Sequence, residues 1–164
     1  MNIWSVANKK ELALLRSKMP EVDLVRTDKK ELKELIAIMR KMMKEANGIG
    51  LSANQIGVKK KMFVAQVPDG EGRPKFYAII NPKLTKLSIV KTSIEEGCLS
   101  VPLKYGPVER PEKVVLEGYA VDGKKIKIKA WGLLARVFQH EVDHLEGKLF
   151  IDKASHLHSR EAGV

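Results

Sequence analysis

The sequence predicts a single α+β domain over residues 1–164, in which antiparallel β-sheets pack around a central metal-binding helix. Three observations lead to this prediction. Short strand-like segments are separated by turn signals, Asp122-Gly123 is a strong hairpin signal, and a histidine-bearing helical segment lies near the C-terminus. A second amphipathic helix is expected near the N-terminus. The chain has no internal repeat, no low-complexity segment and no change in composition that would divide it.

Two helices are expected in the first third of the chain. A short one covers Glu11–Ser17, with irregular chain on either side. The longer helix starts after Thr27 or Asp28, either of which can cap it, and stops at Asn47-Gly48. Its apolar residues recur at steps of three and four and define one buried face: Leu32, Leu35, Ile36, Met39, Met42, Met43 and Ala46. Methionine at this spacing indicates core filling rather than a methionine-binding groove.

Strands are expected in the middle of the chain. Apolar and β-branched residues predict them over 62–67, 76–80 and 84–91. Asn81-Pro82 is expected to end the second of these, because proline cannot donate a hydrogen bond to a sheet ladder.

The following segment combines a predicted loop with a predicted hairpin. The proline-bearing residues 102–111 are expected to form an extended, exposed loop. Strands over 113–121 and 124–130 flank Asp122-Gly123 and form the hairpin. In the second strand lysines alternate with apolar residues, so one face is expected to be buried and the other solvated.

Composition and charge narrow the possible classes of protein. With 44% hydrophobic and 30% charged residues, the chain is an ordinary globular protein. No signal-peptide pattern is present, and no run approaches the roughly 20 apolar residues of a membrane span, so a cytoplasmic protein with no membrane partner is expected. Thirty basic against twenty acidic residues give a net charge of +10, which favours contact with polyanions such as RNA. Because the charge is spread along the chain, a solvated basic surface is an equal alternative, and no specific DNA binding is expected.

Residues 139–150, QHEVDHLEGKLF, carry the clearest chemical pattern. His140 and His144 are four residues apart, so on a helix both imidazoles project from one face and can chelate one metal ion. Glu141 lies about 100° around the helix from His140, where it can take a proton from a metal-bound water. Gly147 follows the segment at the position of a left-handed helix cap. The alternative is an ordinary amphipathic helix with two histidines near the core.

A hydrolytic metal site needs a third protein ligand and one open position. The metzincin pattern would place that ligand at Phe150, which cannot bind a metal, and a thermolysin-like pattern leaves only Glu161. The remaining strong ligand is Cys98, the only cysteine. A single cysteine excludes an intramolecular disulfide and fits a reducing compartment, where metal binding is a common use of a thiol. Spacing alone favours zinc.

Two further segments stand out because they are rich in small or polar residues. GIGLSANQIG, residues 48–57, is compatible with a helix cap and turn. It lacks the third glycine of a G-x-G-x-x-G motif and the lysine of a P-loop, so it does not indicate phosphate binding. The second segment, EEGCLS, ends at Ser100 and contains the single cysteine.

Together, three motifs resemble the signature motifs of the peptide deformylase family, in the same order. They are Gly48–Gln55, Glu96–Ser100 and Gln139–Leu145, and the resemblance extends over about residues 28–152. It implies a metal-dependent hydrolase that removes the N-formyl group from the initiator methionine of newly synthesised polypeptides and releases formate. N-formylmethionyl nascent peptides would be its substrates, and its basic surface would allow a transient ribosome contact.

The resemblance assigns metal binding to three residues: Cys98, His140 and His144. They would hold one divalent ion per chain, Fe2+ physiologically, with Ni2+, Co2+ or Zn2+ able to substitute. A metal-bound hydroxide would attack the formyl carbon, with Glu141 as general base and acid. The side chain of Gln55 and the backbone N–H of Leu99 would stabilise the developing oxyanion.

The resemblance also assigns a substrate-binding surface. Ile49 and Gly50 would border the cleft and pair with the substrate backbone. The pocket for the methionine side chain would be shaped by four residues: Ile94, Glu96, Leu133 and Val137. Tyr105 departs from the family pattern, since some members have an arginine there near the substrate.

Two other functions remain open at this point. One is an inactive or re-purposed family member, although every active-site residue that the resemblance assigns is present. The other is a basic RNA-binding module whose metal is structural. Such a site would have four protein ligands, and the sequence offers no convincing fourth.

Overall fold

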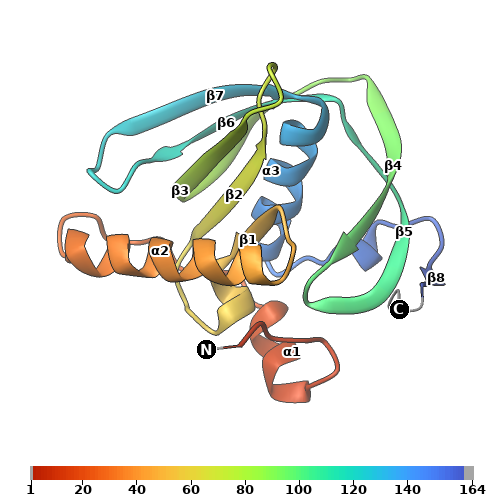
Figure 1. The fold of residues 1–164 in the computed structure, drawn as a ribbon, viewed down its shortest axis with the longest axis horizontal. Helices are drawn as coiled ribbons and strands as arrows, with labels where there is room; N and C mark the ends of the chain where they lie inside the picture. Colours follow the sequence, from red (N-terminus) through yellow and green to blue (C-terminus); the bar gives the residue numbers. More distant parts are fainter. Residues whose placement is uncertain (1, 161–164) are drawn as a thin grey trace.

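The computed structural model describes residues 2–160 and places one long helix between two antiparallel sheets (Figure 1). The helices are α1 (Lys9–Leu15), α2 (Lys29–Glu45) and α3 (Gly132–Leu145), with short 3-10 helices η1 (Ala53–Ile56) and η2 (Phe150–Asp152). The strands are β1 (Gly50–Ser52), β2 (Met62–Pro68), β3 (Pro74–Leu87), β4 (Lys91–Cys98), β5 (Val101–Pro111), β6 (Lys113–Tyr119), β7 (Lys125–Trp131) and β8 (His158–Ser159). The large sheet has the order β1-β2-β3-β6-β7, and the small sheet β4-β5-β8. The predicted α+β class with a central helix is confirmed.

One face of the large sheet packs against α3. The ring of Phe138 lies 5.7 Å from that of Phe63 and 5.4 Å, edge-on, from that of Tyr77. Phe138 and His140 are two residues apart and so project from opposite sides of the helix. Packing of Phe138 on the large sheet therefore turns the histidines toward the small sheet.

The other face of the large sheet is partly covered by α2. Asp28 caps this helix by accepting a hydrogen bond from the backbone N–H of Lys30 at 2.9 Å. Its apolar face is buried against β1, β2 and Ile80 of β3, in a cluster that includes Leu32, Met39 and Met43. The predicted cap and the prediction that methionine fills core space are both confirmed. No helix in the described range is long and apolar enough to cross a membrane.

β3 is longer than the sequence predicts. It continues through Asn81-Pro82, where the pairing with β6 shifts register between Ile80 and Lys83. Asn81 adopts a left-handed φ of 51°, and its side-chain amide bonds the backbone N–H and C=O of Val22 at 2.8 and 2.9 Å. The predicted strand end was wrong because this bulge accommodates the proline. Of the separate strand predicted over 84–91, residues 84–87 are the end of β3 and Lys91 begins β4.

β5 replaces the exposed loop that was predicted over 102–111. The segment is extended, as expected, but from Tyr105 to Pro111 it pairs with β4. Alternate residues Gly106, Val108 and Arg110 are buried. Local proline content could not show this pairing, because it depends on a partner strand. The predicted hairpin is confirmed by the pairing of β6 and β7 and by Gly123, whose φ is 87°.

Candidate active site

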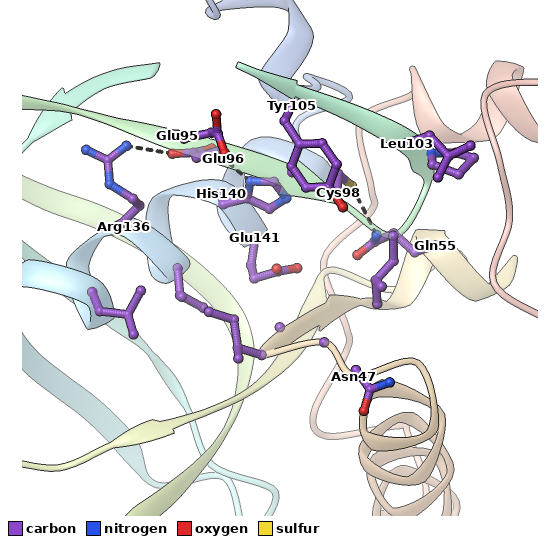
Figure 2. Close-up of a pocket in the computed structure, with 18 residues that line it drawn as sticks. Asn47, Gln55, Glu95, Glu96, Cys98, Leu103, Tyr105, Arg136, His140 and Glu141 are labelled. Carbon is purple, nitrogen blue, oxygen red and sulfur yellow. Dashed lines mark hydrogen bonds and ion pairs between the residues drawn. The ribbon is translucent and has the colours of Figure 1, made fainter. Parts of the chain in front are cut away.

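A cluster of three potential metal ligands lies between α3 and the small sheet. α3 supplies His140 and His144, and the end of β4 supplies Cys98. The Cys98 Sγ atom is 3.1 Å from His144 Nε2, which is 3.2 Å from His140 Nε2. One ligand atom from each residue lies within 4.8 Å of the others. The three residues named from the sequence thus converge at one point. Figure 2 shows two of them, His140 and Cys98, at the cavity.

The thiol and the imidazoles of the cluster strongly influence one another's protonation. Burial would raise the pKa of the Cys98 thiol, but the positive charge and hydrogen bonding of His144 and His140 hold it well below its ordinary value. Burial would likewise lower the pKa of His140, but hydrogen bonds to Cys98 and Glu96 hold it well above its ordinary value. Metal binding at this residue would therefore release a proton from the imidazole. A thiolate and two imidazoles suit a borderline-soft metal ion. Within the described range the cluster has three ligands, which leaves the open position of a catalytic site.

Glu96 fixes the orientation of one ligand. Its Oε2 atom accepts a hydrogen bond of 3.0 Å from His140 Nδ1, so His140 Nε2 is left to face the metal position. Arg110 donates to both carboxylate oxygens at 2.6 and 2.9 Å, and Arg136 donates at 2.8 Å. Burial would raise the pKa of Glu96, but His140 and Arg110 hold it far below its ordinary value. Glu96 lines the cavity, yet its carboxylate is engaged with these three side chains, a role that the sequence did not predict.

We expect Glu96→Gln to weaken metal binding about 10–100-fold, the usual cost of losing a residue that orients a ligand. It should also lower the free energy of unfolding by about 3–5 kcal/mol, because the guanidinium of buried Arg110 loses its main partner. Metal titration and chemical denaturation measure the two effects. Glu109→Gln is the matched control, since exposed Glu109 pairs only with Lys91 and should change stability by less than about 1 kcal/mol. Equal effects of the two substitutions would contradict the role of Glu96.

Glu141 is buried beside the ligand cluster, with 3% of its surface exposed, and its carboxylate points into the cavity (Figure 2). Ser52 donates its hydroxyl to Glu141 Oε2 at 2.7 Å and fixes the carboxylate. A Cβ atom at Gly50 would collide with the same carboxylate, so glycine is required there. Burial raises the pKa of Glu141 above its ordinary value, although His140 and His144 oppose the change. A carboxylate with a raised pKa is suited to take up and release a proton.

Gln55 presents an amide N–H₂ group to the cluster. Its Oε1 atom accepts a hydrogen bond of 2.8 Å from the backbone N–H of Ser52. Its Nε2 atom is therefore directed toward Ser100 Oγ, at 3.1 Å, and Cys98 Sγ, at 3.6 Å. Gln55 and Leu99 both line the cavity. This arrangement holds a neutral donor next to the metal position.

The cluster opens into a cavity of about 580 Å³, a size typical of small-molecule and peptide sites. Of the predicted substrate-binding residues, five line it: Ile49, Gly50, Glu96, Leu133 and Val137. Ile94 does not line it, and its side chain is 51% exposed on β4. Tyr105, which departs from the family pattern, lies at the wall of the cavity (Figure 2).

Three supporting residues were missed in the sequence. Ser52 holds Glu141, Arg110 holds Glu96, and Asn54 donates to the backbone C=O of His144 at 2.7 Å. Ser52 and Asn54 lie inside the GIGLSANQIG motif, so the motif itself was the available signal. Arg110 has no local signal, because only the pairing of β4 with β5 brings it to Glu96.

The two protease patterns receive no support. Phe150 is buried, and its ring stacks on that of His140 with centroids 6.3 Å apart. Glu161 lies outside the described residues.

Comparisons with known proteins agree with this site. The profile of the polypeptide deformylase family matches residues 3–160. The chain is 45% identical over 140 residues to the peptide deformylase of Halothermothrix orenii, covering 85% of this chain and 86% of that one. It is 42% identical over 135 residues to peptide deformylase 1 of Streptomyces avermitilis, covering 80% of this chain and 62% of the relative. The crystal structure of the Thermotoga maritima peptide deformylase superposes with a TM-score of 0.83 at 32% identity, covering 94% of this chain and 97% of that one. The chain belongs to the peptide deformylase family.

Proposed function

We propose that this chain removes the N-formyl group from the N-terminal methionine of newly synthesised polypeptides and releases formate. One observation carries the proposal. A Cys–His–His cluster, a buried carboxylate and an amide donor converge in a single cavity that is open to solvent. Family membership supports the same reaction.

When bound, a divalent metal would lower the pKa of a coordinated water to about 7 and polarise the formyl carbonyl. Cys98, His140 and His144 would hold it. Glu141 takes the proton of the attacking water and delivers it to the departing amine. Gln55 Nε2 and the backbone N–H of Leu99 donate to the oxygen that gains charge as the formyl carbon becomes tetrahedral.

The substrate peptide is proposed to bind along β1. This strand lies at the edge of the large sheet and pairs on one side only, with β2. An extended peptide can therefore add to Ile49–Gly50 by backbone hydrogen bonds. Leu133 and Val137, which project from α3 into the cavity, offer an apolar wall for the methionine side chain. Ile94 is not among the residues that line this cavity.

We propose ferrous iron as the physiological metal, with nickel, cobalt or zinc able to replace it. The direct test is formate release from formyl-Met-Ala-Ser by anaerobically purified protein, together with metal analysis of the same sample. About one metal ion per chain and stoichiometric formate are expected. Metal-loaded protein that releases no formate would contradict the proposed reaction and favour an inactive or re-purposed member.

We expect the iron-loaded enzyme to lose activity in air faster than nickel- or zinc-loaded enzyme. Ferrous iron is oxidised by oxygen, whereas zinc has no accessible redox change. Oxidation of the iron would also expose the Cys98 thiolate to conversion to sulfinic acid. Activity against time in air, with mass spectrometry of the Cys98 peptide, measures this. Equal decay of the iron and nickel forms with unmodified Cys98 would contradict the iron assignment.

The proposed setting is the cytoplasm, where the chain would meet nascent peptides and contact the ribosome transiently through its basic surface. The competing function, an RNA-binding module with a structural metal, predicts salt-dependent RNA affinity without formate release. The three-ligand cluster argues against a purely structural metal, because structural zinc sites are closed by four protein ligands.

A further inference from the structure

On the outer face of the large sheet, α2 packs mainly against β1 and β2 and leaves much of β6 and β7 uncovered. We call this region the lysine face. It includes six lysines and one glutamate, together with a valine and a tryptophan: Lys83, Lys86, Lys113, Lys125, Lys127, Lys129, Glu117, Val115 and Trp131. The pairing of β3 with β6 and of β6 with β7 places these side chains in adjacent rows, with Lys86 and Lys129 on either side of Val115. Figure 1 shows these strands beside one another.

Most of the charge on the lysine face is not neutralised within the fold. Lys127 pairs with Glu117 at 3.2 Å. The other five lysines form no ion pair with any acidic side chain of the described range. Like charges on neighbouring strands repel one another, so this arrangement does not stabilise the sheet. It does create a strong local positive potential that attracts a polyanion.

The row on β7 has a regular geometry. Lys125, Lys127 and Lys129 occupy alternate positions and point to the same side, about 6.7 Å apart. Trp131 continues the row, and 69% of its surface is exposed. Next to it, Leu87, Val115 and Trp131 line an apolar groove of about 560 Å³, whose other lining residues include Lys86, Lys113 and Lys129. An exposed indole beside a row of lysines matches the combination that binds single-stranded nucleic acids, in which bases stack on aromatic rings and cations follow the backbone.

We propose that the lysine face binds single-stranded RNA. The phosphates lie along the lysine row of β7 and a base stacks on Trp131. The lysine row of β7 lies away from the β1 side of the catalytic cavity, because β7 and β1 are the two opposite edges of the large sheet, four strand spacings or about 19 Å apart. Trp131 is nearer to the cavity, since it is two residues before Leu133, which lines it. The chain can therefore hold RNA and a peptide substrate at the same time. The inference does not depend on the proposed reaction, since none of these residues lines the cavity.

Fluorescence anisotropy with a labelled oligouridylate tests the proposal. The triple variant Lys125→Gln, Lys127→Gln, Lys129→Gln should bind about tenfold to a hundredfold more weakly at 0.1 M salt, and its plot of log affinity against log salt should be shallower by about 2. Trp131→Ala should weaken binding with little change in that slope, and Trp131→Phe should restore much of the affinity. Formate release should be unchanged in the triple lysine variant, whose residues do not line the cavity.

A matched triple variant on α2 separates local charge from net charge. Lys30, Lys33 and Lys44 are exposed and form no ion pair in the described range, so changing all three to glutamine removes the same charge elsewhere. This control should keep near wild-type RNA affinity. Equal losses in the two triple variants would overturn the proposal, as would competition by polyglutamate as effective as that by RNA. Binding to anionic phospholipid vesicles without binding to the oligouridylate would also overturn it.

Discussion

Glu141→Gln is expected to keep its metal but to release formate about 10²–10⁴ times more slowly than the wild type. Glutamine is nearly isosteric with glutamate and can still accept the hydrogen bond that Ser52 donates to Glu141 Oε2. It cannot take up a proton at neutral pH, so the attacking water and the departing amine both lose their proton carrier. Single-turnover formate release on samples of known metal content separates the chemical step from metal loss.

Glu146→Gln provides the matched control at the C-terminal end of the same helix. Glu146 directly follows α3. Its carboxylate forms ion pairs with Lys18 and Lys61, and the residue does not line the cavity. Its replacement should leave turnover within about twofold, since partly exposed ion pairs contribute little. If Glu141→Gln keeps its metal and its turnover falls no further than that of Glu146→Gln, the general-base assignment is wrong.

The catalytic helix could be predicted from the sequence because its chemistry is local. His140, Glu141 and His144 are positioned by helical geometry alone, and Gly147 marks the end of the helix with a φ of 73°. The helix α2 was equally predictable, because its cap and apolar period lie within one segment. Cys98 could be assigned as the third ligand only by combining two arguments. A hydrolytic metal site needs a third protein ligand, and the family resemblance places a cysteine ligand at this position.

The supporting groups were not predictable, because they depend on contacts between segments that are distant in the chain. Arg110 reaches Glu96 only after β4 and β5 pair, and the same pairing turns a predicted exposed loop into a strand. β3 continues past Pro82 because the side chain of Asn81 forms a hydrogen bond with the backbone of Val22, which is 59 residues away in the chain. Ile94 matches a family position, but it is not among the residues that line the cavity in this structure.

Cys98→Ser is expected to reduce metal content and formate release together. The Cys98 thiol is held in its anionic form by His144 and His140, whereas a serine hydroxyl stays neutral near neutral pH. Loss of an anionic ligand should weaken metal binding by more than the roughly 10–100-fold expected for Glu96→Gln, which only disturbs the orientation of a ligand. Metal analysis after dialysis, with turnover measured on the same samples, tests this order.

Two further variants separate loss of the ligand from loss of local structure. Ser100→Ala removes the hydroxyl that accepts from Gln55 Nε2 but leaves the thiolate, so it should retain its metal. Cys98→Asp restores an anionic ligand and should retain more metal than Cys98→Ser, although a carboxylate is a harder ligand than a thiolate. Full metal occupancy and full turnover in Cys98→Ser would remove Cys98 from the metal site. Equal metal loss in Ser100→Ala and Cys98→Ser would mean that distortion of the chain between β4 and β5 causes the loss. Ser100→Ala keeps the Cys98 thiolate, so loss of the thiolate could not explain its effect.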